Sequence, residues 1–236
     1  MWRWGRHSES ARKVASLALL LVGTSPLYAQ THEQRSAIGQ IREQLAAVTD
    51  SAALLQRESE AIARAKADRD NPMIHLELGF IAQRLGELTG TKRHFDDAGS
   101  EFQWAAELKP EWPFPWYGLG VAELAIGESQ GEALENIKQM LGKDYLSKAA
   151  DAFGHAARID PAFAEPVIDL ARTAMRQRVR ARLEVARKAL RDAAQTAASG
   201  SGELQLARGQ VEREAGDADS AVAASPASRS TCPRAS

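Results

Sequence analysis

Apolar residues recur at every third or fourth position over most of the chain, a spacing that places them on one face of an α-helix. The first such stripe runs between Thr31 and about Asp70 and comprises Ile38, Ile41, Leu45, Val48, Ala52, Leu55 and Ile62. A second helix can be capped within Thr49-Asp50-Ser51, or one long helix can run through the segment 30–70. The stripe spans hardly more than about three heptads, so it indicates a packed face rather than a coiled coil.

The segment 1–29 has the order of a secretory signal: a basic start, a short apolar stretch and a small residue before a polar segment. The basic residues are Arg3, Arg6, Arg12 and Lys13, and the apolar stretch covers 14–22. This stretch is shorter than the roughly 20 residues that cross a bilayer, which favours removal over anchoring. We expect cleavage after Ala29 and a periplasmic or secreted protein; an uncleaved N-terminal anchor is the alternative.

Two short patterns recur after Pro72. A large residue is followed by a small one in Leu78-Gly79, Leu119-Gly120 and Leu170-Ala171. A second pattern of Ala, Phe, Ala and Pro, at steps of four, three and five, occurs as Ala98, Phe102, Ala105 and Pro110 and again as Ala149, Phe153, Ala156 and Pro161. Two helices cross closely only where small residues meet, so these patterns predict pairs of packed helices, each pair ended by a proline.

These positions resemble the tetratricopeptide repeat (TPR), a helix–turn–helix unit of about 34 residues with the pattern W-x₂-L-G-x₂-Y…A-x₃-F…P. Trp116, Leu119 and Gly120 match its first helix, and the Ala-Phe-Pro sets match its second helix. The resemblance covers about 71–224 and is to exported bacterial-type TPR proteins. It implies an all-α, right-handed solenoid whose concave face binds peptides or protein segments, and it implies no chemistry.

The spacing departs from the family inside two repeats. In the family, the small residue of the first helix lies about twelve positions before the alanine of the second; here the separations are nineteen, from Gly79 to Ala98, and twenty-nine, from Gly120 to Ala149. We therefore expect insertions in the turns inside the repeats, at 88–93 and 128–146. Such inserts lie on one face of a solenoid, often the binding face.

The later units are less regular. No Gly or Pro interrupts 167–199, so the turn of the third unit lies near 178–182 or the helix continues. A fourth unit starts after Ser199-Gly200-Ser201-Gly202 and stops at Ser225-Pro226, where the family has a bulky aromatic residue. The tail, 225–236, is either a product of truncation or a reading-frame change, or a genuine disordered end.

The composition excludes several function classes. The chain is 44% hydrophobic with a net charge of −1, which argues against disorder and against a nucleic-acid partner and leaves at most peripheral contact with membranes. One cysteine makes neither a disulfide framework nor a multi-cysteine zinc site. His75 occupies an aromatic position of the first repeat, and His94 with its neighbouring aspartates favours a helix cap over a metal site. We expect no catalytic residue, metal or cofactor.

An aromatic segment, 112–117, is the first candidate docking surface. Pro113 and Pro115 are expected to hold it extended and to direct its aromatic side chains to opposite sides. Trp116 falls at a core position, whereas Trp112 and Phe114, with Tyr117, are candidate anchors for a partner. Packing of these residues is the alternative.

A basic stretch, 172–191, is the second candidate. It contains eight basic residues and one acid, Glu184, and the partner-binding candidates in it are Arg172, Arg176 and Arg180. Such a patch can bind acidic proteins or anionic lipids. The alternative is a solvated face, neutralised by acids of neighbouring repeats.

The sequence thus predicts an exported, non-catalytic scaffold that binds a peptide or protein partner. The alternatives are an accessory segment of a larger envelope enzyme or transport complex, and an enzyme with a site in the insert 128–146. The sequence leaves open whether the chain's own segment 31–70 fills the groove, which would make the protein self-inhibited or dimeric.

Overall fold

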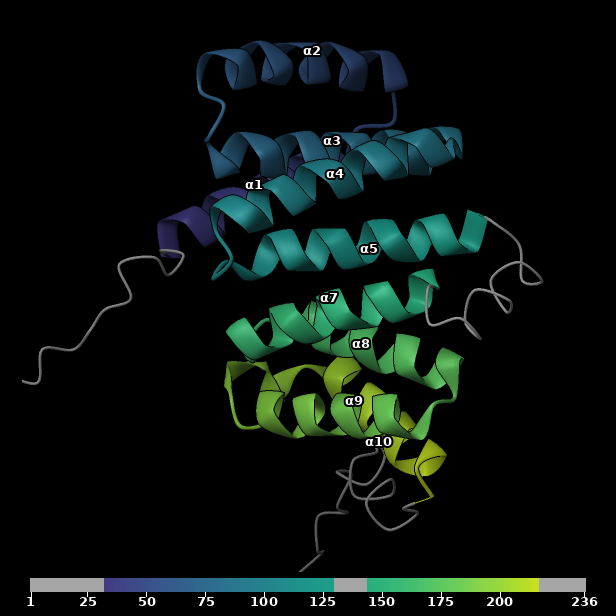
Figure 1. Ribbon diagram of the computed structural model, residues 1–236. Coiled ribbons are helices and arrows are strands. Elements are labelled where there is room, and N and C mark those ends of the chain that lie inside the picture. The colour runs from purple at the N-terminus through teal and green to yellow at the C-terminus, as the bar shows by residue number, and fades with distance from the viewer. Residues whose placement is uncertain (1–31, 130–143, 217–236) are drawn as a thin grey trace, which may run out of the picture.

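The computed structural model describes residues 32–129 and 144–216, and every regular element in these residues is a helix (Figure 1). The elements are α1 (His32–Ala46), α2 (Ser51–Ala67), α3 (Pro72–Thr89), α4 (Lys92–Leu108), α5 (Pro113–Ser129), α7 (Tyr145–Ile159), α8 (Ala164–Gln177), α9 (Arg180–Ala193), the 3₁₀ turn η1 (Ala197–Gly200) and α10 (Gly202–Glu214). The predicted all-α class is confirmed.

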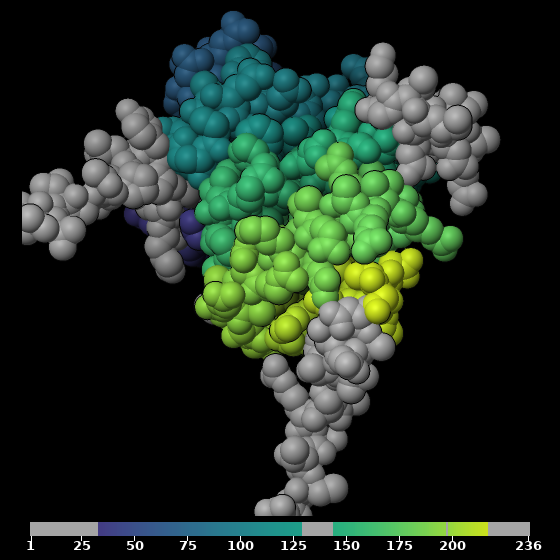
Figure 2. Space-filling view, turned by 60° about the horizontal axis from the view of Figure 1, so that its bottom comes forward, coloured from purple at the N-terminus to yellow at the C-terminus, as the bar shows by residue number. Residues whose placement is uncertain are grey.

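From α2 to α10, each helix packs on the next, so that chain order is also the order in space (Figure 1). The helices pair as α3 with α4, α5 with α7, and α8 with α9, and in each pair we call the earlier helix the first and the later helix the second. α1 breaks this order, because it packs on α3. In Figure 2 its purple atoms lie beside teal and green ones rather than beyond the blue end of the molecule.

Local sequence sets the helix ends. The side chains of Asp50 and Asn71 accept hydrogen bonds from backbone N–H groups two residues on, which satisfies donors left free at a helix N-terminus. Pro72 then fits the first helical position, where its missing N–H is no loss. Gly90 closes α3 with φ of +65°, a conformation that costs glycine little.

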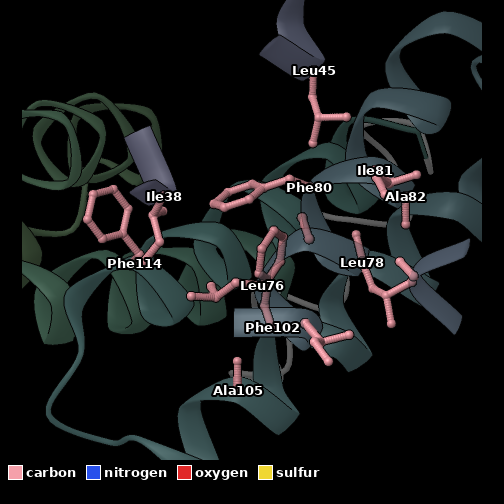
Figure 3. Packing of buried hydrophobic residues seen from close by; sticks show 14 of the residues in the cluster. Ile38, Leu45, Leu76, Leu78, Phe80, Ile81, Ala82, Phe102, Ala105 and Phe114 are labelled. Atoms are coloured by element: carbon pink, nitrogen blue, oxygen red, sulfur yellow. The ribbon is translucent and has the colours of Figure 1, made fainter. Parts of the chain in front are cut away.

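The close helix crossings fall at the glycines and phenylalanines of the repeat pattern. A Cβ on Gly79 would lie 2.6 Å from the Phe102 ring, and one on Gly120 would lie 2.5 Å from the Phe153 ring. Both rings are fully buried. Figure 3 shows Phe102 among the side chains of the N-terminal core, with Leu76 and Leu78 of α3 nearby. Pro110 and Pro161 each lie two residues beyond the end of a second helix, as predicted.

The predicted insertion at 88–93 is not a loop. α3 runs to Thr89 and α4 starts at Lys92, so only two residues link them. The seven extra residues are nearly two helical turns, which lengthens the pair and keeps the same faces together. The ring of Phe95 lies against Gly86, repeating the Phe102–Gly79 contact further along both helices.

Two further turns were expected, in the long insert 128–146 and in the third unit. The long insert falls between the end of α5 at Ser129 and the start of α7 at Tyr145, and 130–143 lies outside the described residues. The third unit does turn within 178–182, because Arg178 adopts φ of 54° and closes α8. The third unit thus has two helices rather than one continuous helix.

The segment before the repeats forms two helices, and its apolar stripe does not continue through both. Ile38 and Leu45 of α1 are buried, but in α2 the buried residues are Leu54 and Ala61, while Leu55 is 49% exposed. Of the two alternatives, the second helix capped within Thr49-Asp50-Ser51 is the one observed, because Asp50 caps α2. The expected packed face holds in α1 but not in α2, because the chain changes direction between the two helices and different positions of α2 face inward.

The C-terminal part begins at the predicted break. Ser201 caps α10 by accepting a hydrogen bond from the N–H of Leu204. The predicted aberrant tail, with Cys232, lies outside the described residues. Within the described residues, no helix is both long and apolar enough to cross a membrane.

Candidate binding groove

The first helices α3, α5 and α8 share a surface with an aromatic floor. Phe80 of α3 is buried, and Phe114 of α5 packs against Phe163, which directly precedes α8, with ring centroids 4.7 Å apart. Tyr117 lies edge-on to the same ring at 5.2 Å. We call this surface, from Phe80 to the start of α8, the first-helix groove.

α1 lies in the first-helix groove. Its two buried residues, Ile38 and Leu45, belong to the same apolar cluster as Phe80 and Phe114. Figure 3 shows Ile38 beside Phe114 and Leu45 above Phe80. The chain's own helix therefore covers the surface that was expected to bind a partner.

Two arginines of α1 make charged contacts with the side of the groove next to the start of α8. The Arg42 guanidinium lies 5.0 Å from the Tyr117 ring centroid and 3.9 Å from a carboxylate oxygen of Glu165. Arg35 pairs with Asp160, in the turn before α8. Cations are attracted both to aromatic faces and to carboxylates. The groove thus combines an aromatic floor with an acidic edge.

A third acid, Asp169, lies under this edge. The Tyr117 hydroxyl donates a hydrogen bond to Asp169 Oδ2, with 3.4 Å between the oxygens. Burial raises the pKa of the Asp169 carboxyl, against the opposing effect of Arg172, and burial raises the pKa of Tyr117 as well. Tyr117 is therefore a neutral hydrogen-bond donor that holds this side of the groove in place.

α1 leaves part of the groove open. A cavity of about 420 Å³ lies beside it, lined by residues of α1, α3 and α8. On α1 these include Gly39 and Arg42; opposite them are Gln83, Glu87 and Glu165. The groove is wider than the helix that occupies it.

The aromatic docking segment is corrected by the structure. Trp112 is 2% exposed and Phe114 is 8% exposed, so neither offers a free surface to a partner. The link is not extended either, because α5 begins at Pro113 and both prolines lie in its first turn, where proline is tolerated. The alternative, packing, is the arrangement observed.

Trp116 is half-buried between the two helices of its repeat. Its indole N–H donates to the carbonyl oxygen of Pro110 at 2.9 Å, and its ring packs at a tilt of 37° against His155 with centroids 4.1 Å apart. Leu119, one turn on, packs against the N-terminal core. Both positions predicted from the repeat pattern therefore pack within the fold.

The predicted basic patch is largely neutralised. Arg172 pairs with Asp169 at 3.1 Å, and Arg176 pairs with Glu128 of α5 at 2.7 Å. Arg180 is exposed at the start of α9. Pairing with acids of the chain itself is what the alternative of a solvated face predicts, and the structure does not gather these three arginines into the first-helix groove.

His75 is a packing residue. His75 is 2% exposed and stacks on Trp104 with centroids 4.3 Å apart. Its ring nitrogens contact Glu101 Oε2 at 2.6 Å and the Arg69 carbonyl oxygen at 2.7 Å. His94 lies in the first turn of α4. No group of three or more histidine, cysteine or acidic residues in the described segments is arranged to hold a metal.

The sequence did not reveal the contacts of α1. Arg35 and Asp160 are 125 positions apart, and no repeat spacing relates them. One signal was present: Arg35, Ile38, Arg42 and Leu45 recur at steps of three, four and three, which places both arginines and both aliphatic residues on one helix face. That face is the one turned to the groove.

Stacked helix pairs with Gly–Phe crossings and a groove on the first helices define a TPR-like solenoid. The chain is similar in structure to TTC0263, a thermophilic TPR protein of Thermus thermophilus, with a TM-score of 0.52, 17% sequence identity, and coverage of 84% of this chain and 92% of that one. No protein-family model matches the sequence. A search among curated proteins finds no match either.

Proposed function

We propose that the chain is an exported, non-catalytic scaffold that binds a protein or peptide partner in the first-helix groove. One observation carries this proposal: an amphipathic helix, α1, already lies in the groove on an aromatic floor and an acidic edge. Repeat arrays use such extended concave surfaces for binding. The proposal of export rests on the signal-like order of residues 1–29.

The test is site-specific photocrosslinking in the source cell envelope. Gln83 lines the open part of the groove, and Gln103 is exposed on the second helix α4. Each donates a hydrogen bond to a glutamate four residues on, which makes them a matched pair. A photoreactive residue at position 83 should capture a discrete protein that position 103 does not capture, and the purified captured protein should bind the purified chain saturably.

Equal capture from both positions would contradict a groove-directed scaffold. Recovery of an enzyme or transport subunit would assign the chain to a larger envelope complex. Export is tested separately, by N-terminal sequencing of the protein from fractionated cells. A mature N-terminus at residue 30 in the envelope fraction is expected, and an intact N-terminus in the cytoplasmic fraction would contradict it.

A further inference from the structure

We infer that α1 is a displaceable occupant of the partner site, and that the partner presents an amphipathic helix with two arginines and two aliphatic residues spaced as on α1. The inference rests on the proposed function and adds the chemistry of the partner and a means of regulating its access.

The groove recognises a specific pattern on α1. Arg35 and Arg42 are seven residues apart, as are Ile38 and Leu45, so the four side chains lie along one face. Ile38 is 0% exposed and Leu45 is 4% exposed, against the aromatic floor. A partner helix needs aliphatic residues at these two positions to reproduce that burial.

The groove also has a specific environment for the arginine at position 42. Three rings surround the Arg42 guanidinium: Tyr117 at 5.0 Å, and Phe80 and Phe114 each at 5.9 Å. Arginine suits this place better than lysine, because its planar guanidinium stacks on aromatic rings and also pairs with carboxylates. An acidic residue here would face Glu165 instead. The groove therefore selects an arginine-bearing helix.

Two features of α1 favour its displacement from the groove. Gly39 lies near its middle, and a Cβ there would meet no atom within 4 Å, so packing does not require a glycine. Glycine in a helix interior lowers helix stability relative to alanine. The cavity beside α1 also leaves part of the groove without protein contacts. Both features lower the cost of displacing the helix.

Displacement sets the apparent affinity of any partner. A ligand that needs the open groove binds with an affinity reduced by the fraction of molecules in which α1 has left it. Changes that strengthen α1 should weaken binding, and changes that weaken α1 should tighten it. Such an inverse relation between the stability of α1 in the groove and the affinity for a partner is expected of a helix that occupies the binding site. It is not expected of a helix that only supports the fold.

The experiment measures binding of a fluorescently labelled peptide of residues 31–47 to the full chain by anisotropy. Ile38→Asp/Leu45→Asp removes α1 from the groove and should tighten binding at least about tenfold, since burying two carboxylates is strongly unfavourable. Gly39→Ala strengthens α1 and should weaken binding about two- to fivefold. A peptide carrying Arg42→Ala should lose about tenfold in affinity for the double variant.

Leu55→Asp/Ile62→Asp is the matched control, because it places the same two charges on exposed aliphatic residues of α2 and should leave binding unchanged. Circular dichroism establishes that the double variant is folded. If it is not, Gly39→Ala still decides, since nothing in the structure opposes its added methyl group. Equal binding by wild type and Gly39→Ala, or a folded double variant that does not bind the peptide, would overturn the inference.

Two further outcomes are separable. Sedimentation of a wild-type dimer that the double variant cannot form would assign the groove to α1 of a second copy and overturn the partner chemistry. If the photocaptured protein binds wild type, Gly39→Ala and the double variant equally, the proposed function stands and the role of α1 fails. If the peptide behaves as expected and position 83 captures no protein, the proposed function fails and the occupancy of the groove by α1 stands.

Discussion

The ring of Phe102 lies so close to Gly79 that a Cβ on the glycine would approach it to 2.6 Å. The same ring meets Gly118 of the next repeat, where a Cβ would also lie 2.6 Å away. One buried phenylalanine of α4 is therefore held between glycines of two first helices, α3 and α5. This contact joins consecutive repeats, so its loss should destabilise the packing of both α3 and α5 against α4.

Gly79→Ala should destabilise the protein by about 1–3 kcal/mol, because the added methyl group forces Phe102 or the helix backbone to move in a closely packed core. The measurement is urea denaturation followed by circular dichroism. Gly39→Ala is the control, since the same change in α1 meets open space and should add up to about 1 kcal/mol of stability. Equal effects at the two sites would contradict the predicted crossing.

Contacts within and between neighbouring repeats were predictable because each is fixed by short spacings. The steps from Ala98 to Phe102 and Pro110 place a small residue, a core ring and a helix end, and all three fall where the pattern predicts. In a solenoid each repeat contacts mainly its neighbours, so local spacing carries most of the fold. The predicted insertion in the turn at 88–93 is wrong because spacing alone does not distinguish extra turn residues from added helical turns.

The occupied groove was not predictable in the same way. It depends on contacts such as Arg35 with Asp160, which bring together segments more than a hundred residues apart. The prediction that the aromatic segment 112–117 is extended and exposed is wrong for a different reason. Proline favours extended backbone in the residue before it, but it also fits the first turn of a helix. At Pro113 the second preference prevails, and it carries Phe114 into the core.

Trp112→Ala should destabilise the protein by about 3–5 kcal/mol, because it removes a large side chain from a core site that collapses only in part. Trp116→Ala, on the same segment, should cost less, about 1–2 kcal/mol, because that ring is half-buried. Thermal melts of both variants give the comparison. A larger loss of stability in Trp116→Ala than in Trp112→Ala would contradict the deeper burial of Trp112. A binding defect in Trp112→Ala would have to be compared with the loss of stability of that variant before it is assigned to docking.

Arg187 and Glu212 form an ion pair between α9 and α10 in which the glutamate side chain is only 4% exposed and the atoms Nη2 and Oε2 lie 2.5 Å apart. Arg187→Met should cost about 3 kcal/mol, since it leaves a buried carboxylate without its cation. Combining it with Glu212→Leu should recover most of that loss, because no buried charge remains. Urea denaturation of the single and double variants measures the coupling.

The control for the Arg187 and Glu212 variants is an exposed ion pair on the same helix, α9. Lys188 and Asp192 lie 2.7 Å apart with side chains 73% and 45% exposed. Lys188→Met should change stability by less than about 0.5 kcal/mol, as is usual for surface ion pairs. If both pairs respond alike, burial of Glu212 does not govern the interaction between α9 and α10.

His155 should make stability fall as the solution is acidified. Burial against Trp116, together with the positive charge of Arg158, lowers the pKa of His155 below its ordinary value of 6.5. Arg158 also donates a hydrogen bond to His155 Nδ1 across 3.2 Å, which requires that nitrogen to be unprotonated. Below about pH 6.5 the unfolded chain therefore binds a proton at this residue more readily than the folded chain, and the free energy of unfolding must decrease with falling pH.

His155→Phe keeps an aromatic ring against Trp116 and removes the titrating group, so it isolates this contribution from the other histidines. Between about pH 7.5 and 5, the free energy of unfolding of the wild type should fall more steeply than that of the variant. Chemical denaturation at a series of pH values, followed by tryptophan fluorescence, measures the difference. Parallel curves would mean that folding does not alter proton binding at His155. A steeper fall of the free energy of unfolding in the variant would mean that folding raises, rather than lowers, the pKa of His155.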